Sequence, residues 1–414
     1  MSRRLRILVF TPSLPYPPIW GFGIRVYQTV RHLAARHEVS LLTYAGPEQA
    51  EHVARLRQEC HAVHVVPPPC RNRRLAQLVS LASSASFLRA DLYSEAMQST
   101  IDALLRRERF DIIQVESSHL GGFDFHGRAT LILDEHNIEY ELLHRMVQTE
   151  RAPLRRLFNW AEYRKFRREE QGCWDRADGV VMTSERERDL LRGLRPDKPA
   201  VCAPNGVDIE YFRPPDAVPD PGSVVLTGLM RYRPNIDAAL FFAQDVLPRI
   251  RRVRPDVVFT VVGAGPPEEI KQLAGPHIVV TDMVPDVRPY IRRAAALVVP
   301  LRMGSGTRLK VLEGLAMGKA MVSTSVGCEG IAVRDGEHLL IADDADAFAR
   351  AVLRLLDDRD LAAALGRRGR TLAEREYSWE SVVAGLEAFY GRVLAHAPQA
   401  RRVPDAVPPG VPAT

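Results

Sequence analysis

Cysteines are few in this sequence, and long apolar runs are absent. The five cysteines among 414 residues are scattered and show no CxxC spacing, which excludes a disulfide framework and a cysteine-based metal knuckle. No apolar run approaches the roughly 18 residues that cross a bilayer. The basic N-terminus reaches Thr11 and Pro12 after only a short apolar stretch, which is too short for a signal peptide. We therefore expect a cytoplasmic protein.

Neither sign of charge dominates the chain. It carries 56 basic and 51 acidic residues, a net charge of +5, and this excess is too diffuse to predict a nucleic-acid partner. Hydrophobic residues make up 46% and charged residues 26%, which is typical of a globular protein. The length favours about two to three domains. We expect no nucleic-acid partner.

A strand, a glycine turn and a helix follow one another in the second half. The apolar run 294–301 predicts a buried strand, and the small residues 304–307 predict a turn. A helix through Met317 and a strand at 320–324 come next, and apolar spacing places one face of that helix in the core: Leu309, Leu312, Leu315 and Ala316. Glycines let backbone N–H groups approach a ligand, and a helix N-terminus attracts anions. The turn therefore predicts a phosphate site.

Two cations strengthen this prediction. Arg308 and Lys310 lie in the first turn of the predicted helix, where positive charge opposes the helix dipole unless an anion is present. The alternative is an ordinary strand–turn–helix crossover with solvated charges.

The first half opens like a doubly wound parallel sheet. A strand over 4–10, a loop with glycines at Gly21 and Gly23, a helix and a strand at 39–43 follow in order. Glycine in such a turn serves either backbone geometry or a ligand, and both interpretations stay open. Further strands are predicted at 62–66, 111–115 and 130–133, with 179–183 as the last strand of this half.

Polar residues follow two of these strands directly. Glu116 comes after the strand 111–115, and His136 lies just past the strand 130–133. Ligands of open α/β sheets bind at the carboxyl ends of strands, so these side chains are candidates for function. A purely structural histidine is the alternative.

Residues 151–168 form a basic segment with an apolar stripe at helical spacing. It contains seven basic residues and one glutamate. We interpret it as a solvated helix that packs on the sheet. The alternative is an amphipathic helix that contacts anionic lipid.

The second half repeats the strand–helix pattern after proline-rich segments at 204–208 and 213–222, which predict an interdomain linker. A strand at 223–227, a helix over 236–253 and a strand at 257–262 lead into Gly263-Ala264-Gly265. This resembles a dinucleotide fingerprint, but Glu268 occupies the third glycine position. An NAD site is therefore disfavoured.

Taken together, the segments resemble the retaining family 4 glycosyltransferases of the GT-B fold, over about residues 5–395. The matching stretches are PYPPIWGFGIR, DEHN at 134–137, TSERERDLL at 183–191, PNGVD at 204–208, RPNID at 233–237, VVGAGP at 261–266, VPDVRPYI at 284–291 and GSGTRLKVLEGLAMGKAMVSTSVGCEG at 304–330. The last stretch is similar to a GSGTRLK-type branch of the family's Glu-x7-Glu motif.

The resemblance implies two Rossmann-like α/β domains that face a cleft and close on the donor. Residues 1–205 would be the acceptor-side domain and 206–375 the nucleotide-sugar domain. A helix over 376–396 is expected to return to the first domain, and the proline-rich tail 397–414 is expected to be disordered.

The implied activity is a retaining hexosyltransferase reaction in polysaccharide or glycolipid synthesis. A nucleotide-diphosphate sugar would donate to a hydroxyl of a glycan, lipid-linked or small-molecule acceptor. No cofactor or metal is expected beyond this co-substrate, and the protein would be cytoplasmic or peripheral at the inner membrane face.

The resemblance also assigns roles to residues of this chain. Glu313 would bind the donor ribose, and Ser305 replaces the sugar-binding first glutamate of the motif. Arg308 and Lys310 would neutralise the diphosphate, and His136 would position the sugar. The remaining donor contacts are Gly21, Gly23, Arg231, Val284, Gly304, Gly306, Thr307 and Leu309. Glu116 and His119 would lie on the acceptor side.

Two other functions fit parts of the pattern. Ser305 favours a catalytically weak binding or assembly subunit of the same fold. A sugar-nucleotide epimerase is a second alternative. Glu313, Arg308, Lys310 and His136 together favour the transferase.

Overall fold

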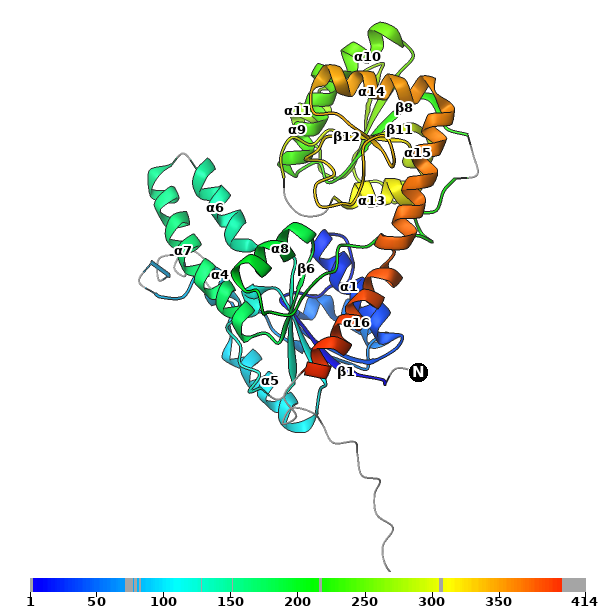
Figure 1. Ribbon diagram of the computed structural model, residues 1–414. Coiled ribbons are helices and arrows are strands. Elements are labelled where there is room, and N and C mark those ends of the chain that lie inside the picture. The colour runs from blue at the N-terminus through cyan, green and yellow to red at the C-terminus, as the bar shows by residue number, and fades with distance from the viewer. Residues whose placement is uncertain are drawn as a thin grey trace, which may run out of the picture. The chain divides into compact units, whose positions relative to one another are not determined.

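Two parallel sheets organise the protein, one in each of two units (Figure 1). The computed structural model describes residues 3–70, 77, 80–81, 83–127, 129–150, 152–215, 218–304 and 308–396. The first unit combines Met1–Ala203 with the C-terminal segment from Val383, and the second unit is Pro204–Val382. The tail that we expect to be disordered, 397–414, lies outside the described residues.

Within the described residues, the sheet of the first unit has seven strands in the order β3-β2-β1-β4-β5-β6-β7. The strands are β1 (Arg6–Thr11), β2 (Glu38–Tyr44), β3 (Ala62–Val66), β4 (Ile112–Glu116), β5 (Thr130–Glu135), β6 (Gly179–Met182) and β7 (Ala200–Cys202). The strand order reverses between β1 and β4, and ligands bind beside such reversals in doubly wound sheets. Residues 7–10 of β1 are completely buried, as expected for a central parallel strand covered on both faces.

One strand of this sheet contradicts the sequence prediction. We predicted that 179–183 is the last strand of the first half, but β7 follows it and pairs with β6. The strand is three residues long and its residues are only half-buried. So short an element shows no periodicity in the sequence.

Helices cover the first sheet. They are α1 (Gly21–Ala34), α2 (Ala50–Arg57), α4 (Phe87–Leu92), α5 (Glu95–Arg107), α6 (Glu139–Thr149), α7 (Pro153–Arg176), α8 (Glu185–Leu194) and α16 (Trp379–His396). Ser94 and Ser184 begin α5 and α8, because their hydroxyls accept hydrogen bonds from backbone N–H groups of the first turn.

The C-terminal helix α16 packs against the first sheet. A Cβ atom at Gly179 of β6 would lie 2.7 Å from Phe389 and 2.9 Å from Val393, so glycine permits the close approach of helix and strand. The hydroxyl of Tyr390 donates a hydrogen bond to Gln114 of β4. Residues from the end of the chain therefore reach the centre of the first sheet.

In the described part of the second unit, the sheet has six strands in the order β10-β9-β8-β11-β12-β13. The strands are β8 (Asp220–Thr227), β9 (Val258–Val262), β10 (Ile278–Val280), β11 (Ala294–Val299), β12 (Met321–Ser323) and β13 (Leu340–Ile341). The helices are α9 (Arg233–Phe241), α10 (Leu247–Val253), α11 (Glu268–Lys271), α12 (Arg288–Arg293), α13 (Leu309–Ala316), α14 (Ala345–Asp357) and α15 (Arg359–Leu372).

Two boundaries in this unit differ from the predictions. The predicted linker 213–222 overlaps β8, which begins at Asp220. The predicted helix 236–253 begins earlier, at Arg233, and contains a π-helical segment, Phe242–Val246, between α9 and α10. Pro248 follows that segment, and because it has no N–H it cannot form the regular helical hydrogen bond, which explains the local change of winding.

Candidate functional site

The helix α13 begins at the carboxyl end of β11 and packs directly on the sheet. Its buried face includes Leu312, Leu315 and Ala316, as the sequence predicted. Gly314 allows this approach, because a Cβ atom there would overlap Leu297 of β11. Gly318, with φ +61°, follows the end of the helix. The N-terminus of α13 is thus held at the edge where ligands of parallel sheets bind.

Lys310, on the first turn of α13, contacts the first turn of α9 and lies beside the loop that connects β8 to α9. Its Nζ donates to Asn235 Oδ1 at 2.7 Å, and Asn235 Nδ2 donates to the carbonyl oxygen of Leu229 at 2.9 Å. Gly228 has φ +149°, and a Cβ atom there would lie 2.8 Å from Lys310 Nζ. The loop therefore needs glycine at 228 both for its backbone conformation and to admit the lysine.

Arg308 and Gly304 lie beside each other before α13. The side chain of Arg308 is buried, and a Cβ atom at Gly304 would lie 3.2 Å from Arg308 Nη2. Gly304 has φ +131°, a conformation that favours glycine. The other predicted turn residues, Ser305, Gly306 and Thr307, lie outside the described residues.

Glu313 follows Lys310 by one helical turn. Burial raises the pKa of Glu313 to about 7, against the opposing effect of the Lys310 charge. Burial lowers the pKa of Lys310 to about 8, against the opposing effect of Glu313. The charged form of each group therefore carries a desolvation cost, which a ligand phosphate near Lys310 and ligand hydroxyls near Glu313 would offset.

The loops after β8, β9 and β10 are joined to one another. The Oδ1 atom of Asp282 accepts hydrogen bonds from the backbone N–H of Gly265 at 3.0 Å and of Met283 at 2.7 Å. Arg231, which is exposed, lies beside Gly265. Val284 is half-buried in the next loop. These predicted donor contacts therefore share the carboxyl edge of the sheet with α13.

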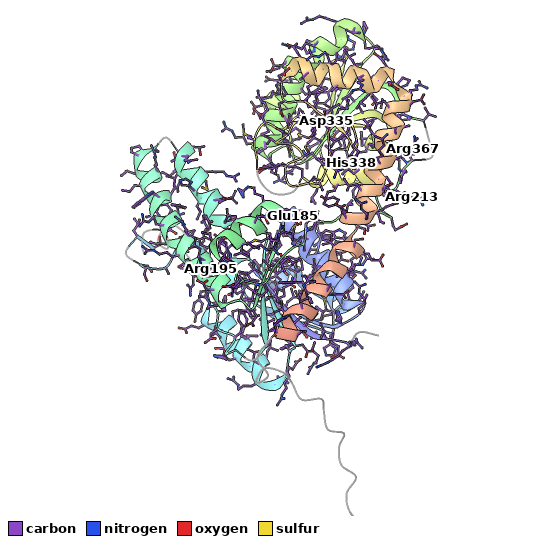
Figure 2. All side chains as sticks on the ribbon, in the orientation of Figure 1. Glu185, Arg195, Arg213, Asp335, His338 and Arg367 are labelled. Atoms are coloured by element: carbon purple, nitrogen blue, oxygen red, sulfur yellow. The ribbon has the colours of Figure 1, made fainter. Side chains whose placement is uncertain are left out.

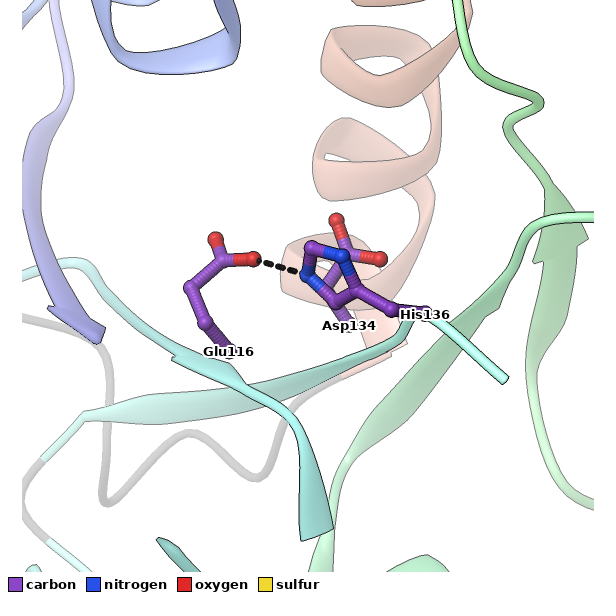
Figure 3. A group of neighbouring side chains, drawn as sticks. All are labelled: Glu116, Asp134 and His136. Atoms are coloured by element: carbon purple, nitrogen blue, oxygen red, sulfur yellow. Dashed lines mark hydrogen bonds and ion pairs between the residues drawn. The ribbon is translucent and has the colours of Figure 1, made fainter. Parts of the chain in front are cut away.

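A polar cluster occupies the corresponding edge of the first sheet. Glu116 of β4 is paired in register with Asp134 of β5, and His136 lies just beyond. Figure 3 shows the contact between Glu116 and His136, whose Oε2 and Nε2 atoms are 2.8 Å apart. Arg25 of α1 donates to both oxygens of Asp134, at 2.8 and 3.1 Å, and to the carbonyl oxygen of Ala203. Side chains from two strands and a helix thus form one network.

Gln114 and Tyr390 extend this network to the C-terminal helix. Gln114 Nε2 donates to Glu116 Oε1 at 2.7 Å, while its Oε1 accepts from the Tyr390 hydroxyl. Gln114 and Glu116 point to the same face of β4 because they are two residues apart. Both oxygens of Glu116 are therefore engaged, one by Gln114 and one by His136.

The protonation of this cluster follows from its burial. Burial raises the pKa of Glu116 to about 7, although the Gln114 hydrogen bond and Arg25 lower it. Burial lowers the pKa of His136 to about 4, so its imidazole is neutral near pH 7. The ring stacks on Phe22, with centroids 4.5 Å apart. Phe22 thereby connects the predicted glycine turn to His136.

The two glycines of that turn differ in their surroundings. A Cβ atom at Gly23 would lie 3.3 Å from both the Pro15 carbonyl oxygen and the Trp20 ring, whereas a Cβ atom at Gly21 would meet nothing within 4 Å. Backbone packing therefore explains Gly23. It does not explain Gly21, which remains a candidate for a ligand contact.

The cluster does not fit a metal ion. One ligand atom from each of Glu116, Asp134 and His136 lies within 4.8 Å of the others. The guanidinium of Arg25, however, already contacts both oxygens of Asp134, and its positive charge would repel a cation at that position. Arg25 supplies the counter-charge that a metal would otherwise provide.

The predicted acceptor-side residues are both engaged within the protein. Glu116 is only 1% exposed. His119 Nδ1 lies 2.7 Å from Ser117 Oγ, its ring packs on Phe166 of α7, and burial lowers its pKa to about 4. A cavity of about 570 Å³ in this unit has a different lining: Ser84, Ala85, Arg89, Ala90, Tyr93, Gly122 and Glu169.

Sequence reasoning missed several members of both sites. Arg25 and Asp134 lie inside the matching stretches but received no role, and Asn235 was also within one. Gln114 had a usable signal, since it precedes Glu116 by two residues in a strand. Tyr390 had none, because its contact spans 276 positions of the chain.

Comparison with known families identifies both units. Residues 20–211 match the family described as "Glycosyltransferase Family 4", and residues 221–358 match "Glycosyl transferases group 1". Each unit therefore resembles a glycosyltransferase family. The predicted family resemblance is thereby confirmed at this level.

Curated proteins that this chain resembles include two mannosyltransferases. A phosphatidyl-myo-inositol mannosyltransferase of Mycolicibacterium smegmatis is 31% identical over 47% of this chain and 52% of its own length. A lipopolysaccharide core biosynthesis mannosyltransferase of Rhizobium leguminosarum is 27% identical over 59% of this chain and 73% of its own length. The match with the first thus spans about half of that protein.

Solved structures resemble this chain over nearly its whole length. Sucrose-phosphate synthase from Thermosynechococcus elongatus superposes with a TM-score of 0.68 at 18% identity, covering 95% of this chain and all of the other. HepE from Anabaena, crystallised with UDP, superposes with a TM-score of 0.66 at 13% identity, covering 94% of this chain and all of the other. The predicted GT-B fold class is confirmed. Within the described residues, no helix has the length and apolar character to span a bilayer.

Proposed function

We propose that this protein transfers a sugar from a nucleotide-diphosphate sugar to an acceptor hydroxyl, with retention of anomeric configuration, in the synthesis of a glycan or glycolipid. The observation that carries the proposal is the grouping of Arg308, Lys310 and Glu313 at the start of α13. It lies in the unit that matches the glycosyl transferases group 1. The two mannosyltransferase relatives support a sugar donor and a glycan or glycolipid product.

In the proposed mechanism, the second unit stabilises the leaving nucleoside diphosphate. Negative charge develops on the diphosphate as the glycosidic bond breaks, and Arg308, Lys310 and the N–H groups at the start of α13 neutralise it. Glu313 accepts hydrogen bonds from the ribose hydroxyls, while Arg231 and Val284 border the diphosphate and base. Fixed cations serve this purpose without a metal or cofactor. We therefore propose a metal-independent reaction.

The first unit contributes a neutral imidazole. Held by Glu116 and stacked on Phe22, His136 has a defined orientation and donates or accepts one hydrogen bond to the transferred sugar. The acceptor proton passes to the departing phosphate, as expected for retention with attack from the leaving-group face. Glu116 acts through His136 and does not contact the acceptor. His119 keeps a structural role beside α7.

A nucleotide panel tests the proposed donor site. We expect one nucleoside diphosphate among UDP, GDP, dTDP and ADP to raise the melting temperature in the presence of EDTA. Saturation at 100 times Kd stabilises the folded state by about 2.7 kcal/mol. Differential scanning fluorimetry with each nucleotide and its sugar measures the shift, with NADH as the control. No shift with any nucleotide would contradict the donor site, and a shift abolished by EDTA would contradict metal independence.

Glu313→Gln should weaken binding of that nucleotide about tenfold, because the amide retains the size of the carboxylate but loses its charge-assisted hydrogen bonds to the ribose. Isothermal titration calorimetry measures Kd. Glu329→Gln, which changes an exposed glutamate of the same unit, is the matched control. An unchanged Kd in Glu313→Gln would remove the ribose contact from the proposal.

The affinity for the nucleoside diphosphate should fall as pH rises above about 8. Burial lowers the pKa of free Lys310 to about 8, whereas a bound diphosphate favours the protonated amine and raises its pKa. Binding therefore takes up a proton in this window, and Kd rises by up to about tenfold per pH unit. Titrations at pH 7 to about 9.5 measure the slope. Lys310→Met should bind the nucleotide weakly, with a Kd that does not change with pH. An equal dependence of Kd on pH in both proteins would assign the titration to another group.

A further inference from the structure

The hairpin of α6 and α7 is anchored at one end. The side chains of Phe166, Glu170 and Trp174 in α7 are buried, and the Glu170 carboxylate accepts hydrogen bonds from the first backbone N–H groups of α6, at Glu139 and Tyr140. Arg195, at the end of α8 (Figure 2), pairs with Asp175 near the end of α7. This half of the hairpin contributes buried side chains to the first unit's core. Figure 1 shows α6 and α7 side by side.

The other half of the hairpin exposes large apolar side chains. Leu154 is 83% exposed, Leu157 62% and Trp160 48%, and Met146 of α6 is 51% exposed. In α7 the first three occupy positions i, i+3 and i+6, on the side opposite the buried Phe166. One side of α7 is therefore buried, and the other side exposes an apolar stripe.

Arginines continue the same stripe. Arg164 and Arg168 follow Leu154 at i+10 and i+14, and Arg156 lies beside Trp160 on the helix surface. All three are exposed, and among the described residues no ion pair joins them to a carboxylate. The Arg164 guanidinium lies 5.4 Å from the centroid of the Trp160 ring. Exposed leucines and a tryptophan beside unpaired arginines suit the surface of an anionic membrane, where apolar side chains enter the interface and basic side chains contact the headgroups.

We propose that this face binds the surface of a membrane containing anionic phospholipid, with Leu154, Leu157 and Trp160 in the interface and Arg156, Arg164 and Arg168 at the headgroups. A second copy of the chain fits less well, because a two-fold interface would bring the same arginines together. An anionic lipid surface satisfies the apolar and the basic residues at once. The contact goes beyond the proposed function and does not depend on it.

Vesicle binding by the full-length protein tests the proposal. We expect co-sedimentation with vesicles of phosphatidylcholine containing about 30% phosphatidylglycerol, and binding about tenfold or more weaker without the anionic lipid. Leu154→Asn/Leu157→Asn and the triple variant Arg156→Gln/Arg164→Gln/Arg168→Gln should each bind the anionic vesicles about tenfold less tightly. The triple variant Arg350→Gln/Arg367→Gln/Arg368→Gln removes three exposed charges from the second unit and should bind like the wild type.

Tryptophan fluorescence gives a local readout of the same contact. Anionic vesicles should shift the emission to shorter wavelength, and Trp160→Phe should abolish the shift. Equal vesicle binding by the wild type and both hairpin variants would overturn the proposal. The proposal would also be overturned if the wild type did not bind vesicles but self-associated with rising concentration, and if the hairpin variants lost this self-association. Hairpin variants should keep the wild-type Kd for the nucleotide, so a failed donor site and a failed membrane contact give different results.

Discussion

Replacing Arg308 with alanine should slow sugar transfer at least about tenfold, which corresponds to a barrier increase of about 1.4 kcal/mol or more. The guanidinium of Arg308 is buried beside Gly304, next to the first turn of α13. In a site with little water, a preorganised cation stabilises charge that develops on the leaving diphosphate more strongly than solvent does. The loss should appear mainly in kcat, because this charge is largest in the transition state.

A neighbouring arginine provides the matched control for Arg308. Arg302 precedes the same turn, but its side chain pairs with Asp237 at 2.6 Å and is 46% exposed. Arg302→Ala should keep kcat within about twofold, since an exposed ion pair contributes little. Initial rates with the nucleotide sugar that wins the panel measure both variants. Wild-type turnover by Arg308→Ala would exclude the diphosphate role.

Replacing Arg25 with methionine should destabilise the first unit by about 3–5 kcal/mol, because the variant leaves Asp134 charged and unpaired in the core. The side chains of Arg25 and Asp134 are 3% and 1% exposed, and their closest atoms are 2.8 Å apart. The Arg25 guanidinium also donates a hydrogen bond to the carbonyl oxygen of Ala203. Urea unfolding, followed by the fluorescence of the fully buried Trp174, reports on this unit.

Two variants separate the buried pair from a general loss of charge. Arg36→Met removes a partly exposed arginine that pairs with Glu387 at 2.9 Å, and it should cost less than about 1 kcal/mol. The double variant Arg25→Met/Asp134→Leu should recover much of the lost stability, because no isolated buried charge remains. If Arg25→Met were as stable as Arg36→Met, the ion pair would not support the unit.

The donor-side prediction depends on signals that are local in the sequence. Gly304, Arg308, Lys310 and Glu313 lie within ten positions of one another, and strand, turn and helix each have a recognisable residue pattern. The structure places the described members at the start of α13, as the spacing of residues along a helix requires. The local pattern around α13 did not indicate that Asn235 contacts Lys310. That contact depends on how β8 lies beside β11.

The acceptor-side prediction shows the opposite case. Glu116 and His119 were expected to face an acceptor after the strand 111–115. Glu116 is instead the last residue of β4, and both side chains are engaged with protein groups. Burial at a strand end depends on which helices cover it. The surroundings of Glu116 include Arg25 and Tyr390. These residues lie 91 and 274 positions from it in the sequence.

By itself the sequence determined the α/β alternation, the resemblance to a glycosyltransferase family and the local geometry of α13, because apolar periodicity and turn residues act over a few positions. Only the tertiary structure decided that Arg25 balances the charge of Asp134, that Glu116 orients His136, and that one side of α7 is left uncovered. These features arise when distant segments exclude water together, and the free energy of a buried charge depends on neighbours that the local sequence does not specify.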